Sequence, residues 1–268
     1  LQAYCRQITG CIKHGACTRE RKSLKMCGIV GYIGTRQAPA ICLAGLRRLE
    51  YRGYDSAGIA VVTDDGRLDL RKVVGKLDVM AETLESQPLI GSLGIGHTRW
   101  ATHGKPSVEN SHPHLSCDGK VAVVHNGIIE NYQELRAQLE SEGHEFRSQT
   151  DTEVMAHLVE KYYDGDLREA ARKAVLDLHG AFAFGIICAD SPGELIAVRR
   201  FSPLVVGIGE GENYIASDMG AIRAETDKVY VIGDDELCKI TAAGVEITDL
   251  QLAPIEREVY ELSLIHIS

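Results

Sequence analysis

The final third of the chain is a succession of short apolar segments separated by turn residues, and this pattern restricts the fold more than any other. The segments cover residues 181–189, 194–198, 204–208, 213–216, 229–232 and 237–241. Apolar segments of this length, bounded by Gly, Asp, Asn and Pro, are typical of β-strands. Because no helix pattern alternates with them, they indicate antiparallel strands rather than a regular βαβ repeat.

The preceding part of the chain mixes strand and helix patterns. Strands are predicted at 27–33, 58–62, 68–74 and 120–125, with Asp64-Asp65-Gly66 as a hairpin turn between the second and the third. Helices are predicted at 39–49, 132–139, 154–162 and 167–178, where apolar residues recur with helical spacing. Antiparallel strands combined with such helices indicate a layered α+β domain. No repeat or low-complexity linker interrupts residues 27–262, which we expect to form one domain.

Composition and charge exclude several classes of function. The chain has 268 residues, 44% of them hydrophobic, and is long enough to bury a substantial core. It carries 29 Lys and Arg against 38 Asp and Glu, a net charge of −9, which disfavours binding to the phosphate backbone of a nucleic acid. No apolar run approaches the ~18–20 residues that span a bilayer. We therefore expect neither nucleic acid nor membrane as a partner.

The cysteines favour a reducing compartment. No two of the 8 cysteines are spaced C-x-x-C, and Cys42 and Cys188 lie in apolar runs typical of buried thiols. We expect a cytoplasmic protein, with a secreted disulfide framework as the alternative.

Both ends of the chain differ from the region between them. Residues 1–25 are basic, show neither strand alternation nor a helical stripe, and lack the apolar core of a secretory signal. We expect Met26 to be the true start, so that residues 1–26 are a removed or non-native leader; a native extension is the alternative. Residues 263–268 end without a cap or turn and are interpreted as a truncated tail.

Cys27 is the first candidate catalytic residue. If Met26 is removed, Cys27 carries a thiol and a free α-amino group on one residue, and the amine can serve as the base for its own nucleophile. Ordinary pKa values near 8.5 for a thiol and 7.7–8.0 for an α-amine leave both usable forms present at neutral pH. The alternative is that Cys27 is only the first core residue of a strand.

Two further segments hold candidate binding groups. Arg99 lies in a partly apolar predicted strand within residues 96–104, and a buried Arg requires a carboxylate, supplied either by a substrate or by an internal salt bridge. Asn126 and Gly127 end an apolar run, where a side-chain amide and a backbone N–H can donate to a developing oxyanion. The alternative for this pair is an Asn-Gly turn.

Residues 150–153 match a capping box, with Glu153 three positions after Thr150. Asp151 within it can present a carboxylate to a substrate ammonium. The histidines at positions 97, 103, 112, 114 and 125 have no metal-binding spacing, and the glycine-rich segments 91–96 and 207–211 are not followed by helices as a dinucleotide site requires. We therefore expect no metal and no cofactor.

Taken together, these segments resemble those of a known enzyme family. Residues 26–33, 49–58, 97–106, 125–127 and 150–153 closely resemble, in order, the glutaminase half of the glutamine–fructose-6-phosphate aminotransferase (isomerizing) family of hexosamine biosynthesis. The resemblance covers residues 27–262. It implies a class II glutamine amidotransferase domain with a four-layer αββα sandwich of the N-terminal-nucleophile hydrolase type, and L-glutamine as substrate.

The resemblance also implies a role for each candidate residue. Cys27 would attack the carboxamide, and Asn126 and Gly127 would hold the oxyanion. The residues on the substrate-binding positions are Arg99 for the α-carboxylate, Asp151 for the α-ammonium, Trp100, Thr102 and His103 around the pocket, and Arg52 in a loop that positions the nucleophile. Fructose 6-phosphate would bind only to the isomerase half, beyond this chain, and the full-length enzyme would be a homodimer.

Two other interpretations stay open. The glutaminase domain of amidophosphoribosyltransferase shares the N-terminal Cys but usually has different neighbours than Tyr51, Tyr54 and the segment 100–104. A catalytically silent glutamine-binding module is the second alternative, because residues 1–26, if retained, block the amine of Cys27.

Overall fold

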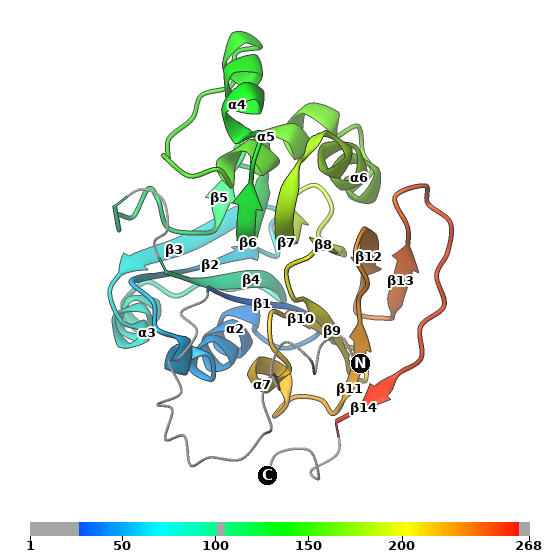
Figure 1. Cartoon of the computed structure of the whole chain (residues 1–268). Helices are drawn as coiled ribbons and strands as arrows, with labels where there is room; N and C mark the ends of the chain where they lie inside the picture. The colour runs from blue at the N-terminus through cyan, green and yellow to red at the C-terminus, as the bar shows by residue number, and fades with distance from the viewer. Residues whose placement is uncertain (1–26, 101–104, 263–268) are drawn as a thin grey trace, which may run out of the picture.

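The computed structural model describes residues 27–100 and 105–262, which form two antiparallel sheets packed face to face between helices (Figure 1). The larger sheet has the spatial order β14 (Tyr260–Glu261), β11 (Lys228–Val231), β9 (Val205–Ile208), β10 (Asn213–Ala216), β1 (Gly28–Ile33), β4 (Leu93–Arg99), β2 (Ser56–Val62) and β3 (Leu68–Val74). The smaller sheet has the order β13 (Val245–Thr248), β12 (Glu236–Ile240), β8 (Leu195–Arg200), β7 (Gly180–Cys188), β6 (Val121–Ile129) and β5 (His114–Leu115).

Helices cover the outer face of each sheet, so the molecule has four layers. On the larger sheet lie α2 (Ala38–Arg47), α3 (Leu77–Ser86) and α7 (Met219–Ile222), drawn in the lower part of Figure 1. On the smaller sheet lie α4 (Tyr132–Ser141), α5 (Glu153–Tyr162) and α6 (Leu167–Asp177), in the upper part of the same view. The expected αββα sandwich is confirmed.

Period-2 alternation in the central strands builds the layers. In β1, Ile29 and Ile33 enter the core between the two sheets, whereas Val30 and Tyr32 pack against the helices of the larger sheet. In β6, Ala122 and Val124 face the other sheet, while Val121 and Val123 face the helices of the smaller sheet. Because successive side chains point to opposite faces, a strand that is apolar throughout fits only between two packed layers.

Every helix and strand predicted from the sequence is present, most of them with shifted ends. The predicted strand at 120–125 is the longer β6, and the predicted helix at 39–49 is α2 followed by the short 3₁₀ helix η1 (Glu50–Arg52). Helices α3 and α7 and strands β5, β13 and β14 were not predicted. Of the helices in the described ranges, none is long and apolar enough to cross a membrane.

Candidate active site

The candidate residues converge where central strands of both sheets meet the segment that leads into α5. A pocket there is lined by Cys27, Arg99, Trp100, His112, His125, Gly127, Thr150, Asp151 and Thr152. Cys27 immediately precedes β1, and Arg99 is the last residue of β4, which pairs with β1. Gly127 comes from β6 in the opposite sheet. The fold therefore brings together segments that are far apart in the sequence.

The thiol of Cys27 is held at the pocket by the backbone of Trp100. The Trp100 N–H donates to Cys27 Sγ at 3.2 Å. Burial raises the pKa of the Cys27 thiol, and this effect is partly offset by the Trp100 N–H and by the positive charge of Arg99. The sulfur is therefore a thiol at neutral pH, and a base must remove its proton before it can act as a nucleophile.

The side-chain amide of Asn126 is fixed in one orientation. His97 Nε2 lies 3.0 Å from Asn126 Oδ1 and 2.9 Å from the carbonyl oxygen of His125, so this ring nitrogen must carry the proton that is donated to both oxygens. Burial lowers the pKa of His97 to about 3, which keeps the ring neutral. The Asn126 amide nitrogen then faces the nucleophile and donates to the Cys27 carbonyl oxygen at 3.1 Å.

Gly127 lies inside β6, where only glycine fits. Its φ is +137°, and a Cβ placed on it would lie 2.0 Å from the carbonyl oxygen of Ala181 on β7. The Asn-Gly turn considered from the sequence is therefore wrong, since both residues belong to a strand paired along its length with β7. The absence of a side chain leaves the backbone of Gly127 bare at the pocket wall.

The predicted capping box is also wrong. Helix α5 begins at Glu153, and its N-cap Thr152 makes no side-chain capping bond. The Glu153 carboxylate instead accepts from the backbone N–H groups of Arg147 at 2.8 Å and Ser148 at 2.7 Å. The segment between Ser148 and Glu153 is thus folded back on itself. Asp151, within it, accepts from the Ile129 N–H at 2.8 Å and lines the pocket.

Thr152 connects this segment to two histidines that also line the pocket. Its hydroxyl lies 2.8 Å from His112 Nε2 and 2.9 Å from His125 Nδ1. Burial lowers the pKa of both rings, so both are neutral, and the hydroxyl can donate to one ring and accept from the other. His97 and Thr152 were not predicted as site residues. For Thr152, the position next to Asp151 in the sequence was the available signal, since polar groups that become buried are usually hydrogen-bonded. His97 lies 29 residues from Asn126, and no local signal links the two.

The remaining predicted residues have different outcomes. Arg99 is 5% exposed and lines the pocket, as does Trp100. Arg52 is also buried, but its ion pair is with Asp218 and its Nε donates to the Tyr51 hydroxyl at 3.2 Å, so it is not a lining residue of the pocket. Thr102 and His103 lie outside the described residues.

Buried neutral histidines make stability depend on pH. Burial lowers the pKa of the imidazoles of His97, His112, His114 and His125. In the unfolded chain these rings take up protons below about pH 6.5, whereas the folded chain resists protonation until a lower pH, which is about 3 for His97. The free energy of unfolding should therefore fall as the pH drops below about 6.5, by up to roughly 1.4 kcal/mol per pH unit for each histidine.

Urea unfolding between pH 7.5 and 5 checks this expectation. The pKa values of Glu153 and Glu160 are lowered to about 2, so these carboxylates lose their contribution to the free energy of unfolding only at a pH below this range. His157 acts in the opposite direction, because Glu153 and Glu160 outweigh its burial and raise its pKa. A free energy of unfolding that stays flat between pH 6.5 and 5 would contradict the assignment of neutral buried rings.

Comparison with known proteins agrees with this geometry. Residues 97–224 match the family model for a glutamine amidotransferase domain. Glutamine–fructose-6-phosphate aminotransferase (isomerizing) of Thermus thermophilus is 54% identical over 237 residues, which are 88% of this chain and 39% of the relative. The chain therefore spans well under half of that relative's length.

Two solved structures share the fold. The glutamine phosphoribosylpyrophosphate amidotransferase of B. subtilis superposes with a TM-score of 0.73 at 29% identity, over 85% of this chain and 50% of that one. A glutamine aminotransferase class-II domain protein of Silicibacter pomeroyi superposes with a TM-score of 0.57 at 18% identity, over 85% of this chain and 100% of that one, and this likeness concerns the fold alone.

The four-layer fold and the family match define a class II glutamine amidotransferase domain of the N-terminal-nucleophile type. Within this class, the chain resembles the glutaminase part of glutamine–fructose-6-phosphate aminotransferases. The identity of 54% to the Thermus relative, against 29% to the phosphoribosylpyrophosphate enzyme, favours the first of the two families considered from the sequence.

Proposed function

We propose that this chain hydrolyses L-glutamine to glutamate and ammonia, with Cys27 as the nucleophile. The observation that carries the proposal is the convergence of Cys27, Arg99 and Asp151 on one pocket whose wall is formed by Gly127. A thiol, a cation, an anion and a bare backbone segment match the reacting and the charged groups of an amino acid amide. The direct test is the release of glutamate from glutamine by the purified chain.

The covalent steps follow from the groups at Cys27. The α-amine of Cys27 takes the thiol proton, and the sulfur forms a bond to the carboxamide carbon. The tetrahedral intermediate collapses with cleavage of the C–N bond, and the protonated amine returns its proton to the leaving ammonia. The amine then removes a proton from water, which attacks the thioester carbon. Glutamate leaves, and the sulfur regains its proton.

Asn126 and Gly127 are the proposed oxyanion donors. An amide nitrogen carries two protons. One is used on the Cys27 carbonyl oxygen, which leaves the second for the developing oxyanion. His97 holds the amide in the orientation that makes this possible, because it donates to Asn126 Oδ1. His97 is thus a positioning residue in this proposal.

The charged ends of glutamine would be held by Arg99 and Asp151. The Arg99 guanidinium, buried at the end of β4, would pair with the α-carboxylate. One oxygen of Asp151 accepts from Ile129, and the other would accept from the α-ammonium. Trp100, Thr102 and His103 would line and close the pocket, and Arg52 would support the loop beside the nucleophile.

The proposed chemistry requires Cys27 to be the first residue of the working domain, which comprises residues 27–262. Residues 1–26 would then be removed. By analogy with the relatives' names, the ammonia would be passed to fructose 6-phosphate on an isomerase part. The homodimer implied by the family resemblance at full length stays a proposal. The described cysteines are all free, which supports a reducing compartment, the cytoplasm.

Removing the Asn126 amide tests the oxyanion assignment. Asn126→Ala should lower kcat by about 10²–10³-fold, as expected for the loss of one oxyanion donor, with little change in KM. Steady-state kinetics of glutamate release measures both. His97→Ala should move kcat in the same direction by a smaller factor, since it frees the amide without deleting it. A change confined to KM would instead place Asn126 in ground-state binding.

A further inference from the structure

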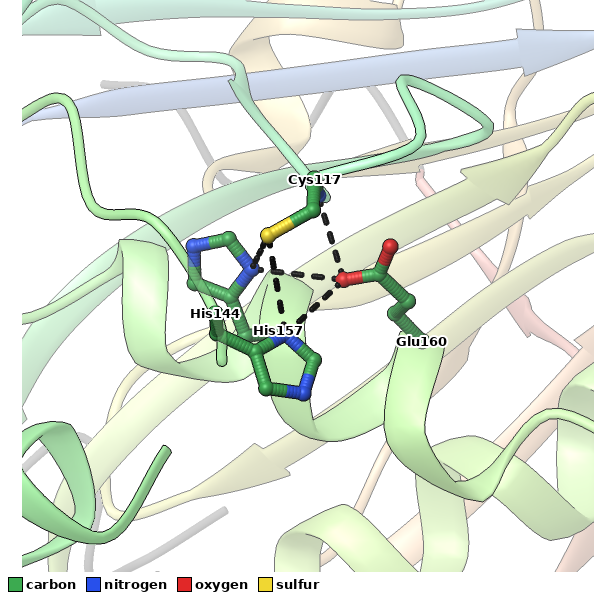
Figure 2. A group of neighbouring side chains, drawn as sticks. All are labelled: Cys117, His144, His157 and Glu160. Carbon is green, nitrogen blue, oxygen red and sulfur yellow. Dashed lines mark hydrogen bonds and ion pairs between the residues drawn. The ribbon is translucent and has the colours of Figure 1, made fainter. Parts of the chain in front are cut away.

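Four potential metal ligands meet on the outer side of the smaller sheet. They are Cys117 in the turn between β5 and β6, His144 in the segment after α4, and His157 and Glu160 on α5 (Figure 2). His157 and Glu160 are three positions apart on one helix, so their side chains project from the same face. One ligand atom from each of the four residues lies within 4.8 Å of all the others.

The spacing of the ligand atoms matches a tetrahedral zinc site. Cys117 Sγ lies 3.6 Å from His144 Nδ1 and 3.5 Å from His157 Nδ1. Glu160 Oε2 lies 3.1 Å from His144 Nδ1 and 3.4 Å from His157 Nδ1. With zinc bonds of about 2.3 Å to sulfur and 2.0–2.1 Å to nitrogen and oxygen, tetrahedral angles require roughly 3.6 Å between S and N and 3.3 Å between N and O.

The surrounding groups hold these ligands in place. The Glu160 carboxylate accepts from the backbone N–H groups of Cys117 at 3.1 Å and Asp118 at 2.9 Å. The other ring nitrogen of the fully buried His157 faces Glu153 Oε1 at 3.7 Å. A carboxylate behind the second nitrogen of a ligating histidine is the usual arrangement around protein-bound metals.

We propose that Cys117, His144, His157 and Glu160 bind one zinc ion. Thiolate, imidazole and carboxylate together suit zinc rather than calcium or magnesium, which prefer oxygen ligands. Because four protein ligands complete a tetrahedron, the ion would have a structural role rather than a catalytic one. The proposal departs from the expectation of no metal, which was argued from the spacing of other histidines.

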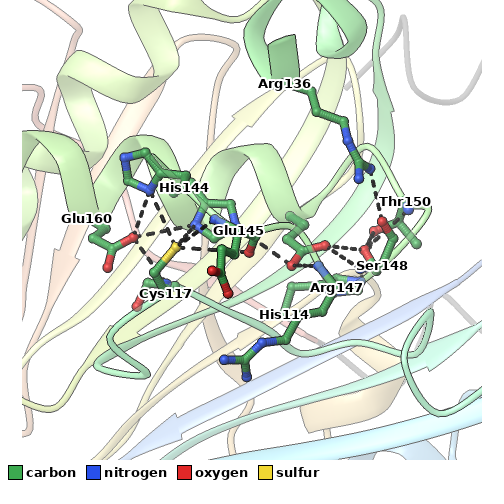
Figure 3. Close-up of polar contacts among 12 residues, drawn as sticks. His114, Cys117, Arg136, His144, Glu145, Arg147, Ser148, Thr150 and Glu160 are labelled. Carbon is green, nitrogen blue, oxygen red and sulfur yellow. Dashed lines mark hydrogen bonds and ion pairs between the residues drawn. The ribbon is translucent and has the colours of Figure 1, made fainter. Parts of the chain in front are cut away.

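The site would stabilise the segment that holds Asp151. Figure 3 shows continuous polar contacts from the Cys117 cluster towards Ser148 and Thr150. Glu153, behind His157, accepts from the Ser148 hydroxyl at 2.6 Å, and that hydroxyl lies 3.0 Å from Thr150 Oγ1. Zinc would thus join the turn at Cys117, the segment at His144 and helix α5 into one unit next to the pocket.

Metal binding to the full chain, residues 1–268, tests the proposal. All measurements use a background in which Cys5, Cys11 and Cys17 are replaced by Ser, so that thiols of the first 25 residues do not contribute. The protein is stripped with a chelator, dialysed against zinc or cobalt(II), and assayed by metal analysis and absorption. We expect one zinc per chain and a cobalt–thiolate charge-transfer band.

Variants assign the metal to the cluster. Cys117→Ser should abolish the cobalt–thiolate band, and His144→Ala, at a half-buried position, should weaken zinc binding by more than about 100-fold, since even outer-shell changes cost 10–100-fold. Cys27→Ser should retain both metal and band, and so should Cys188→Ala. Absence of zinc from the background protein would overturn the proposal. So would zinc binding in Cys117→Ser and His144→Ala that is as tight as in the background protein. Glutamate release is not a readout here, so the outcome is independent of the proposed function.

Discussion

Replacing Cys27 by Ala should reduce glutamate release from glutamine by at least about 10⁴-fold, because the thioester cannot form without the sulfur. Cys27→Ser should lose nearly as much activity, since a hydroxyl is a weaker nucleophile than a thiol at the same position. Both variants should still bind glutamine, because Arg99 and Asp151 remain. The measurement pairs a glutamate-release assay with calorimetric titration of glutamine.

The control for this prediction is Cys188→Ala. Cys188 is buried and pairs with Val121 at the end of the β6–β7 ladder opposite to Asn126 and Gly127, so its replacement removes a thiol without touching the pocket. The turnover of this variant should equal that of the unchanged chain. Retained turnover in Cys27→Ala would exclude covalent catalysis by this residue, and loss of glutamine binding in that variant would mean that the substitution disturbs the pocket as a whole.

The layered α+β class was predictable from the strand and helix patterns, whereas the four layers were implied only by the family resemblance. β1 is buried on both faces, as is β6 from Val121 to Asn126, and only a sheet between two layers accommodates such strands. Helix α3 was not predicted because Leu77 and Met80 are its only fully buried residues among many polar ones, which leaves a weak apolar stripe. Strand β13 was not predicted because Val245 and Glu246 do not belong to an apolar run.

The identities of several site residues were predictable from the sequence, but their arrangement in space was not. Cys27, Arg99 and Asp151 were identified from local pattern and resemblance, and they do line one pocket. The sequence at 150–153 has the spacing of a capping box. In the structure, however, the Glu153 carboxylate accepts hydrogen bonds from the backbone N–H groups of Arg147 and Ser148. His97 positions Asn126 from another sheet, a pairing that no local spacing contains.

The group of Cys117, His144, His157 and Glu160 illustrates the same limit. Only His157 and Glu160 have a local relation, because they share a helix face. The other two residues come from separate turns and meet this face through packing of the layer above the smaller sheet. Motif spacing detects metal sites built on one continuous segment, and it fails when the ligands come from three segments.

A free α-amine on Cys27 should be necessary for turnover. Burial raises the pKa of the thiol, so the sulfur holds its proton at neutral pH, and an α-amine with a pKa of about 7.7–8.0 is the base on the same residue. A peptide bond to residue 26 converts this amine into an amide, which takes up no proton. A chain that retains residues 1–26 should therefore turn over at least about 10²-fold more slowly than one that begins at Cys27, as expected for the loss of a general base.

A third chain, with a single Ala before Cys27, separates the chemistry from steric blockage, because it acylates the amine and adds little bulk. It should be as slow as the chain with all preceding residues. In the chain beginning at Cys27, kcat/KM should rise with pH through the pKa of the amine, and this limb should vanish in the Ala-extended chain. Mass spectrometry verifies the first residue of each protein. Equal activity in the three chains would remove the α-amine from the mechanism and leave the base to be sought among the other groups of the pocket.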